Sequence, residues 1–182
     1  MYAFLSTEQN NWNYDANRSY SDFKKWPRIT ELAWIIYSES GIELSRGYYI
    51  IKPDGWKIPK SISYYTGISN GKAANEGYYM KEVLNELVLK LRSVIYIVDY
   101  VDAKFDKDFI SSELLRYGFA NKIYMKRKIS IQDNCESVFP KTDLISTMNP
   151  VDALNSKLFC EPFIFENSTL KNLCGDAKFF FY

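Results

Sequence analysis

Residues 26–56 read WPRITELAWIIYSESGIELSRGYYIIKPDGW, and this stretch decides the fold. Ile29–Tyr37 is rich in β-branched and aromatic residues, which favour a β-strand. Ser38–Gly41 (SESG) has the composition of a turn. Leu44–Ile51 follows as a returning strand, and the turn-forming residues Pro53–Gly55 end it. The stretch therefore predicts a β-hairpin.

The segments on either side of the hairpin extend it into an α/β domain. Tyr2–Leu5 is a short apolar run that predicts a first, buried strand, and the polar segment Ser6–Lys25 predicts a loop. Met80–Leu91 and Phe105–Tyr117 have apolar residues at helical spacing. Between them, the continuous apolar run Val94–Val98 indicates a buried strand. This order predicts three antiparallel strands followed by a mixed sheet with helices.

Weaker signals complete the expected secondary structure. Pro59–Gly71 is expected to be a loop with one short helix, and Ser69 is a candidate N-cap for the turn that follows. Gly118 stands where a helix C-cap is expected. Lys128–Ile131 is a candidate short strand. Two C-terminal helices are expected at residues 150–160 and 168–182.

Composition excludes several classes of function. The 182 residues suit a single domain, 1–182, and 23 basic against 22 acidic residues leave no basic surplus of the kind that general polyanion binders show. The absence of histidine excludes chemistry that needs an imidazole. Three cysteines without CxxC spacing favour neither disulfides nor a zinc site. No signal peptide or membrane span is recognisable, so a cytoplasmic location is expected.

Several stretches, taken together, resemble the DnaQ-like (DEDDh) 3′–5′ exonuclease family. The resemblance covers nearly the whole chain, and its most specific parts are the WPRI and IKPDG segments. It implies a ribonuclease-H-like exonuclease fold, α/β, with a mixed five-stranded sheet of three antiparallel and then parallel strands, flanked by helices. The matching stretches are FLSTEQNNW (4–12), WPRITELAW (26–34), IIKPDGW (50–56), IPKSISYYTGIS (58–69), VDYVDAKFDKDFI (98–110) and KNLCGD (171–176).

The family's active site is only partly present in this sequence. Such enzymes use four carboxylates to hold two Mg²⁺ or Mn²⁺ ions for hydrolysis of a phosphodiester. The resemblance places three of these catalytic and metal-binding acids at Glu8, Asp106 and Asp176. Ser6 stands where the family has the aspartate that bridges both ions, and Lys171 stands where it has the histidine base.

Both departures weaken the expected chemistry. Three carboxylates supply at most about −3 against the +4 of two divalent ions, and a lost general base costs about 10²–10⁴ in rate. We therefore expect a degenerate exonuclease, a pseudoenzyme or a strongly impaired one, with Mg²⁺ or Mn²⁺ as cofactor only if it is active. The alternative is an active, metal-dependent 3′–5′ exonuclease. Asp99 or Asp102 is a further candidate ligand, although loop acids of this kind more often face solvent.

The remaining candidate residues concern binding. Trp12 matches the family's wedge residue against the terminal base, and Thr66 replaces the histidine of the HGI motif. The pairs Tyr64–Tyr65 and Tyr78–Tyr79 are candidate stacking surfaces, and alternation is expected to bury one tyrosine of each pair. The expected partner is the 3′ end of a single-stranded nucleic acid, or a protein. No membrane partner is expected.

Overall fold

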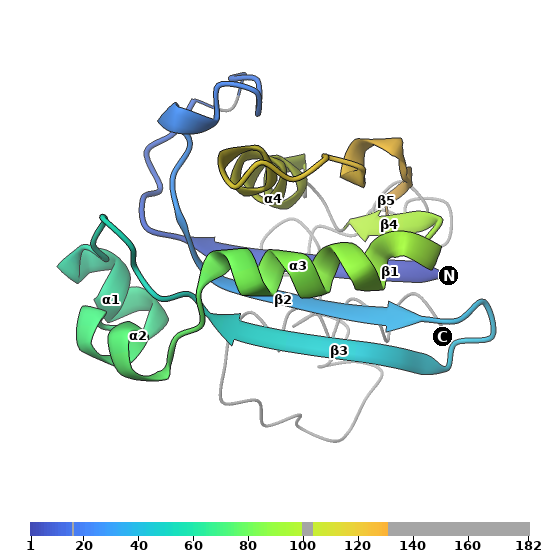
Figure 1. The fold of residues 1–182 in the computed structure, drawn as a ribbon, viewed down its shortest axis with the longest axis horizontal. Helices are drawn as coiled ribbons and strands as arrows, with labels where there is room; N and C mark the ends of the chain where they lie inside the picture. Colours follow the sequence, from blue (N-terminus) through green and yellow to red (C-terminus); the bar gives the residue numbers. More distant parts are fainter. Residues whose placement is uncertain (16, 100–103, 131–182) are drawn as a thin grey trace, which may run out of the picture.

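The computed structural model describes residues 1–15, 17–99 and 104–130 of the chain, which form an α/β domain (Figure 1). Its elements are the strands β1 (Tyr2–Gln9), β2 (Ile29–Tyr37), β3 (Glu43–Ile50), β4 (Tyr96–Asp99) and β5 (Arg127–Ser130), and the helices α1 (Lys60–Thr66), α2 (Asn70–Glu76), α3 (Met80–Lys90) and α4 (Lys104–Arg116). Short 3₁₀ helices lie at Phe23–Lys25, Leu91–Ser93 and Ile123–Met125.

The five strands form one mixed sheet in the order β3-β2-β1-β4-β5. β2 is antiparallel to both β1 and β3, whereas β4 is parallel to β1 and β5 is parallel to β4. This arrangement confirms the expected fold class and the expected hairpin. In the β1–β2 register Glu8 lies directly across from Glu31.

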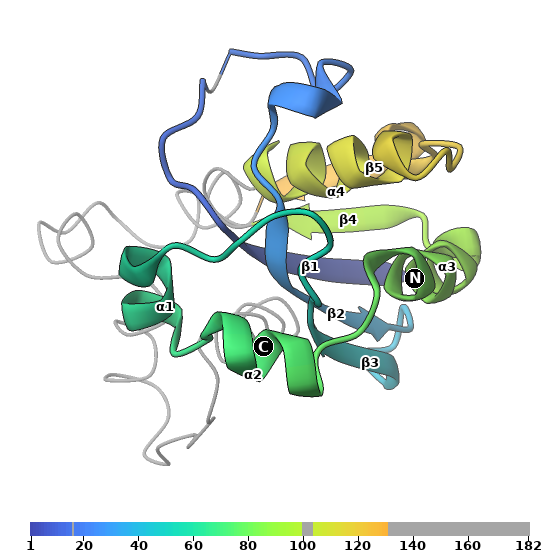
Figure 2. The ribbon, with the colours of Figure 1, turned by 60° about the vertical axis from the view of Figure 1, so that its left-hand side comes forward.

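Apolar side chains on both faces of the sheet explain why β1 and β2 occupy its centre. On one face Leu5, Leu32 and Trp34 join a core that α3 and α4 cover with residues such as Leu84 and Phe109. Figures 1 and 2 show these two helices lying against the sheet. The opposite face carries a second buried set: Phe4, Ala33, Ile35 and Val98. Central strands buried on both faces have the continuous apolar sequence that Ile29–Tyr37 showed.

The helices α1 and α2 form a smaller unit at one end of the sheet. Figure 2 shows them apart from α3 and α4. A separate core of Ile50, Ile58, Ile62, Ile68 and Ala73 holds them there. Ile62 is the buried residue of α1, whereas Tyr64 and Tyr65 are exposed. The side chain of Asn10, just past β1, donates to the Lys57 carbonyl at 3.4 Å, so this unit lies next to the carboxyl end of β1.

Some local expectations were right and others wrong. The Ser69 side chain accepts a hydrogen bond from the backbone N–H of Lys72, so the predicted N-cap is confirmed. Gly118 has the left-handed φ of 75° expected of a helix C-cap. The expected short helix within Pro59–Gly71 is confirmed as α1, and the segment beyond Ser69 forms a second short helix, α2, where only a turn was expected. The helices expected at 150–160 and 168–182 lie outside the described residues.

The largest correction concerns Ser6–Gln9, which was expected to begin a loop. These residues continue β1, because pairing with β2 extends to Glu8 and Gln9. The polar composition of this segment hid the strand, since its backbone is held by cross-strand hydrogen bonds rather than by apolar side chains. The segment Ser6–Glu8, which we call the first motif, thus lies on a strand. None of the helices in the described ranges is long and apolar enough to span a membrane.

Candidate functional site

The first motif lies at the end of β1, where the neighbouring strand β4 has stopped. Among the described residues, β4 pairs with Tyr2–Phe4 of β1, and none pairs with the β4-facing edge of β1 at Thr7. The backbone N–H of Thr7 donates instead to Oδ1 of Asp106 on α4, at 2.8 Å. The Thr7 hydroxyl donates to the same oxygen. Asp106 is therefore held against the strand that carries Ser6 and Glu8.

Gln9 reinforces this arrangement. Its side-chain amide donates to the Thr7 hydroxyl at 2.7 Å and to the Thr7 carbonyl oxygen at 3.0 Å. Because the Thr7 hydroxyl accepts from Gln9, its own hydrogen is directed to the Asp106 carboxylate. Thr7 and Gln9 are both buried, so this short chain of bonds is shielded from water.

Glu8 projects from the other face of β1 and meets a second glutamate. Glu31, directly across on β2, is fully buried, and the Tyr48 hydroxyl donates to its Oε2 at 2.8 Å. Burial, followed by the charges of Glu31 and Asp106, raises the pKa of Glu8 from 4.5 to about 7. About half of the Glu8 side chains are therefore protonated near neutral pH.

The sequence reasoning did not identify Glu31 as part of the site. The available signal was a charged residue inside the otherwise apolar ITELAW run, which is unusual for a buried strand. Only the strand register shows that this carboxylate lies beside Glu8 rather than elsewhere on the sheet.

Arg28 fastens α4 to the start of β2 and the end of β1. Its Nε donates to Glu113 Oε1 at 2.8 Å, and its Nη2 donates to the Tyr117 hydroxyl at 3.1 Å. Its backbone N–H donates to Oδ1 of Asn10, whose own N–H donates to the Arg28 carbonyl. Burial by itself lowers the pKa of Arg28, but the charge and hydrogen bond of the fully buried Glu113 raise it above its usual value.

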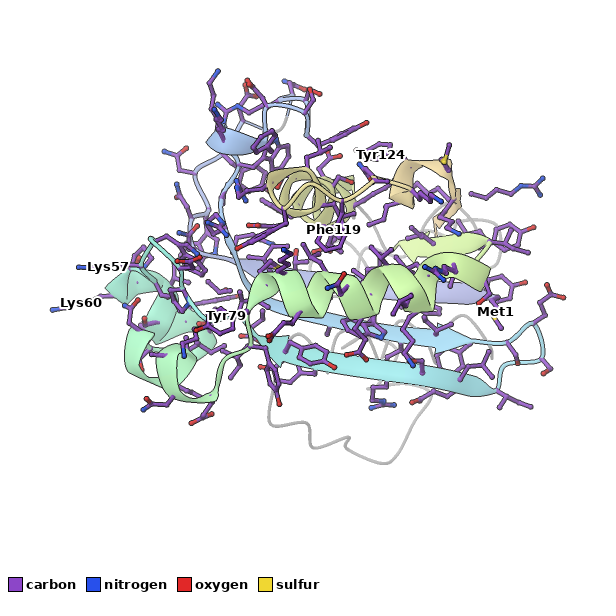
Figure 3. All side chains as sticks on the ribbon, viewed as in Figure 1. Met1, Lys57, Lys60, Tyr79, Phe119 and Tyr124 are labelled. Atoms are coloured by element: carbon purple, nitrogen blue, oxygen red, sulfur yellow. The ribbon has the colours of Figure 1, made fainter. Side chains whose placement is uncertain are left out.

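The candidate binding residues lie around α1. Trp12 is half exposed and contacts the Tyr65 ring edge-on, with ring centroids 5.1 Å apart. Figure 3 shows Lys57 and Lys60 pointing outward at this same end. The Thr66 hydroxyl donates to the Ile62 carbonyl at 2.9 Å and accepts from the Ile68 N–H, so it is engaged in ending α1.

The tyrosine pairs differ from the expectation. Each of the four residues in the pairs Tyr64–Tyr65 and Tyr78–Tyr79 exposes more than half of its surface, and Tyr64 exposes 93%. The prediction that one tyrosine of each pair is buried is wrong, because neither pair lies on a strand where alternation applies. The first pair is on α1, and the second precedes the first turn of α3. The result is a set of exposed rings.

Part of the expected site lies outside the described residues: Asp176, Lys171 and Asp102. Asp99 ends β4, on the strand next to β1. Among residues 1–15, 17–99 and 104–130, no three Asp, Glu or Cys side chains are arranged to hold a metal ion. The described carboxylates therefore do not by themselves fit the two-ion site that the exonuclease fold implies.

Comparison with known proteins supports the fold. No protein-family model and no curated relative matches the sequence. An exonuclease I structure matches over 97% of this chain and 39% of its own, with a TM-score of 0.74 and 12% identity. A complex of E. coli exonuclease I with a dT13 oligonucleotide matches with a TM-score of 0.71, and an exonuclease I complex with SSB-Ct matches with 0.73, both at 12% identity. These two matches cover 99% of this chain and 39% and 40% of theirs.

The chain thus has the exonuclease I type of ribonuclease-H-like fold and spans about two-fifths of the length of those proteins.

Proposed function

We propose that this domain is a degenerate 3′–5′ exonuclease that hydrolyses nucleic acid very slowly or not at all. In this proposal the domain retains the binding groove that the family resemblance implies, and this groove takes a nucleic-acid 3′ end or a protein partner. The observation that carries the proposal is the reduced negative charge of the first motif. Ser6 supplies a neutral hydroxyl beside Glu8, and the pKa of Glu8 is raised to about 7.

Electrostatics makes this combination unfavourable for two divalent ions. Hard cations need ionised oxygen ligands, and a carboxyl that is half protonated near neutral pH supplies only part of its charge. Asp106 and Asp176 would then hold the ions with little help from β1. Lys171, at the position of the family's base, would add positive charge and could not accept the proton of the attacking water at neutral pH.

The surface around α1 supports retained binding. Trp12 and Tyr65 present exposed rings, and base–aromatic stacking contributes about 1–3 kcal/mol per base. Lys57 and Lys60 add positive charge nearby. The oligonucleotide and SSB-Ct complexes of the similar exonuclease I structures make a nucleic acid or a protein the reasonable first ligands to test.

One assay separates binding from hydrolysis. We expect the protein to bind 3′-labelled single-stranded DNA or RNA while releasing almost no labelled nucleotide in Mn²⁺. Trp12→Ala should weaken binding by about 5-fold or more, in line with the loss of one stacked base. Rapid nucleotide release that Glu8→Ala abolishes would contradict the proposal.

Rescue provides the matched positive control. Ser6→Asp together with Lys171→His restores the family pattern, and we expect nucleotide release to rise by at least about 10²-fold, the lower bound for a recovered general base. If the wild type neither binds nor hydrolyses single strands, and the double variant is also silent, the groove has lost its nucleic-acid role and the protein-partner form of the proposal remains.

The bond between Thr7 and Asp106 favours a second candidate, a weakly active metal-dependent exonuclease. This bond already holds the Asp106 carboxylate in place near Glu8. In that case calorimetry should detect millimolar or tighter binding of Mn²⁺, and Asp106→Asn should reduce it. The absence of any binding at millimolar Mn²⁺ would dismiss this candidate.

A further inference from the structure

A second surface that combines tyrosine rings with basic side chains lies along the start of α4, the segment before β5, and β5 itself. We call it the α4–β5 face, and it consists of Tyr20, Lys107, Lys122, Tyr124, Lys126 and Arg127. Figure 3 shows Tyr124 beside α4, well away from Lys57 and Lys60. This surface is therefore distinct from the aromatic group on α1.

The part nearest the candidate site combines two stacked rings with a cation. Tyr20 and Tyr124 stack with their ring centroids 4.4 Å apart and their planes 25° from parallel. The amine of Lys107 lies 4.1 Å from the centre of the Tyr124 ring. Lys107 directly follows Asp106 in the chain, so this group begins one residue from the acid that Thr7 holds.

Positive charge is concentrated beyond Tyr124. Between Tyr117 and Ser130 the chain has no acidic residue. The Lys126 amine is fixed by a 2.6 Å bond to the Val94 carbonyl, and burial together with the nearby charge of Lys122 lowers its pKa. Arg127 lies over the Tyr96 ring, at 6.0 Å from the ring centre.

Two of the positive charges on this face, those of Lys122 and Arg127, form no ion pair with a described acid. The ion pairs found among the described residues join other groups, and neither Lys122 nor Arg127 takes part in one. Both side chains are exposed. A chain whose formal charge is only +1 thus has a strongly positive region at one edge of its sheet.

We propose that the α4–β5 face binds the phosphates of a single-stranded nucleic acid, with Lys122 and Arg127 as the contacts. Proteins that bind single strands without sequence preference follow the backbone with a positively charged surface, and this face supplies one. The face begins beside Asp106, so one strand can extend from the candidate site along it. The inference rests on the proposed function for the chemical class of ligand, but it assigns a separate surface.

Charge reversal with a matched control tests the assignment. Lys122→Glu/Arg127→Glu and Lys72→Glu/Lys81→Glu change the net charge equally, and all four side chains are exposed. The control pair lies on α2 and α3. Binding of a fluorescein-labelled dT20 oligonucleotide is measured by anisotropy from about 50 to 500 mM NaCl, after thermal unfolding confirms that both variants are folded.

We expect the α4–β5 variant, but not the control, to lose affinity and salt dependence. Each phosphate contact contributes about 0.7 to the slope of log affinity against log salt for single strands. Loss of two contacts should therefore reduce the slope by about 1.4 and weaken binding by about 20-fold or more at 0.1 M salt. Tyr124→Ala removes no charge and should leave the slope unchanged.

The outcomes separate this inference from the proposed function. If the wild type binds the oligonucleotide and Trp12→Ala weakens binding, while the α4–β5 variant matches its control, the inference is overturned and the proposed groove stands. If the wild type binds no single strand at all, both nucleic-acid assignments fail. Stronger binding of polyglutamate than of the oligonucleotide to this face would assign it to an acidic protein instead.

Discussion

Replacing Glu8 with Gln is expected to stabilise the protein at neutral pH. The fold raises the pKa of Glu8 from 4.5 to about 7 through burial and through the charges of Glu31 and Asp106. Ionisation of this carboxyl is thus less favourable in the folded protein than in the unfolded chain. Glutamine keeps the shape and removes the charge, so the variant avoids this cost.

The sign and size of the effect follow from linkage. Below about pH 4.5 Glu8 is protonated in both states and contributes no ionisation penalty. As the pH rises to about 7, the unfolded chain ionises first and the wild type loses stability relative to Glu8→Gln. The full difference corresponds to about 3 kcal/mol, because each unit of pKa shift is about 1.4 kcal/mol.

Urea unfolding of both proteins between pH 4 and 8, followed by tryptophan fluorescence, measures this difference. The Glu8 carboxyl can also be followed by ¹³C NMR, and Glu31→Gln should lower its pKa because it removes the second largest cause of the shift. A wild-type stability that stays constant or increases relative to Glu8→Gln from pH 4.5 to 7 would refute the argument.

Three further substitutions test the packing around the site, each by the midpoint of urea unfolding. Thr7→Val removes the hydroxyl bond to the α4 carboxylate and should cost about 2 kcal/mol, whereas Thr7→Ser should cost less; equal losses would contradict this. Gly47→Ala places a Cβ 2.3 Å from the Trp34 ring and should cost about 1–3 kcal/mol, so an unchanged midpoint would refute the contact. Arg28→Met removes one charged hydrogen bond from the buried Glu113, which stays paired with Arg116, and should cost about 2 kcal/mol; an unchanged midpoint would contradict this.

The central hairpin and the main helices could be predicted from the sequence because local patterns specify them. Ile29–Tyr37 is buried on both faces and is therefore apolar at all positions except Thr30 and Glu31. Met80–Lys90 buries one stripe and therefore shows helical spacing. Such patterns depend on short-range periodicity, which a single sequence displays. The two helices around Ser69 were harder to predict, since each has only seven residues.

The candidate site was predicted less completely. Glu8 and Asp106 were identified through a family resemblance, and the structure places Asp106 against the strand that carries Glu8. Glu31 was missed because its importance comes from cross-strand register, which no local pattern reveals. One tyrosine of each pair was wrongly expected to be buried, and all four are exposed. Alternation applies to strands, whereas these segments form a helix and a connecting turn.

The sequence by itself determined the order of the main strands and helices, the absence of histidine and the neutral side chain at Ser6. The tertiary structure decided which charges share a space: Glu8 meets Glu31 across β1 and β2, and Lys107 meets Tyr124 across α4 and the segment before β5. The physical reason is that electrostatic coupling depends on distance in space and on burial. Both are set when strands pair and helices pack, and neither follows from separation along the chain.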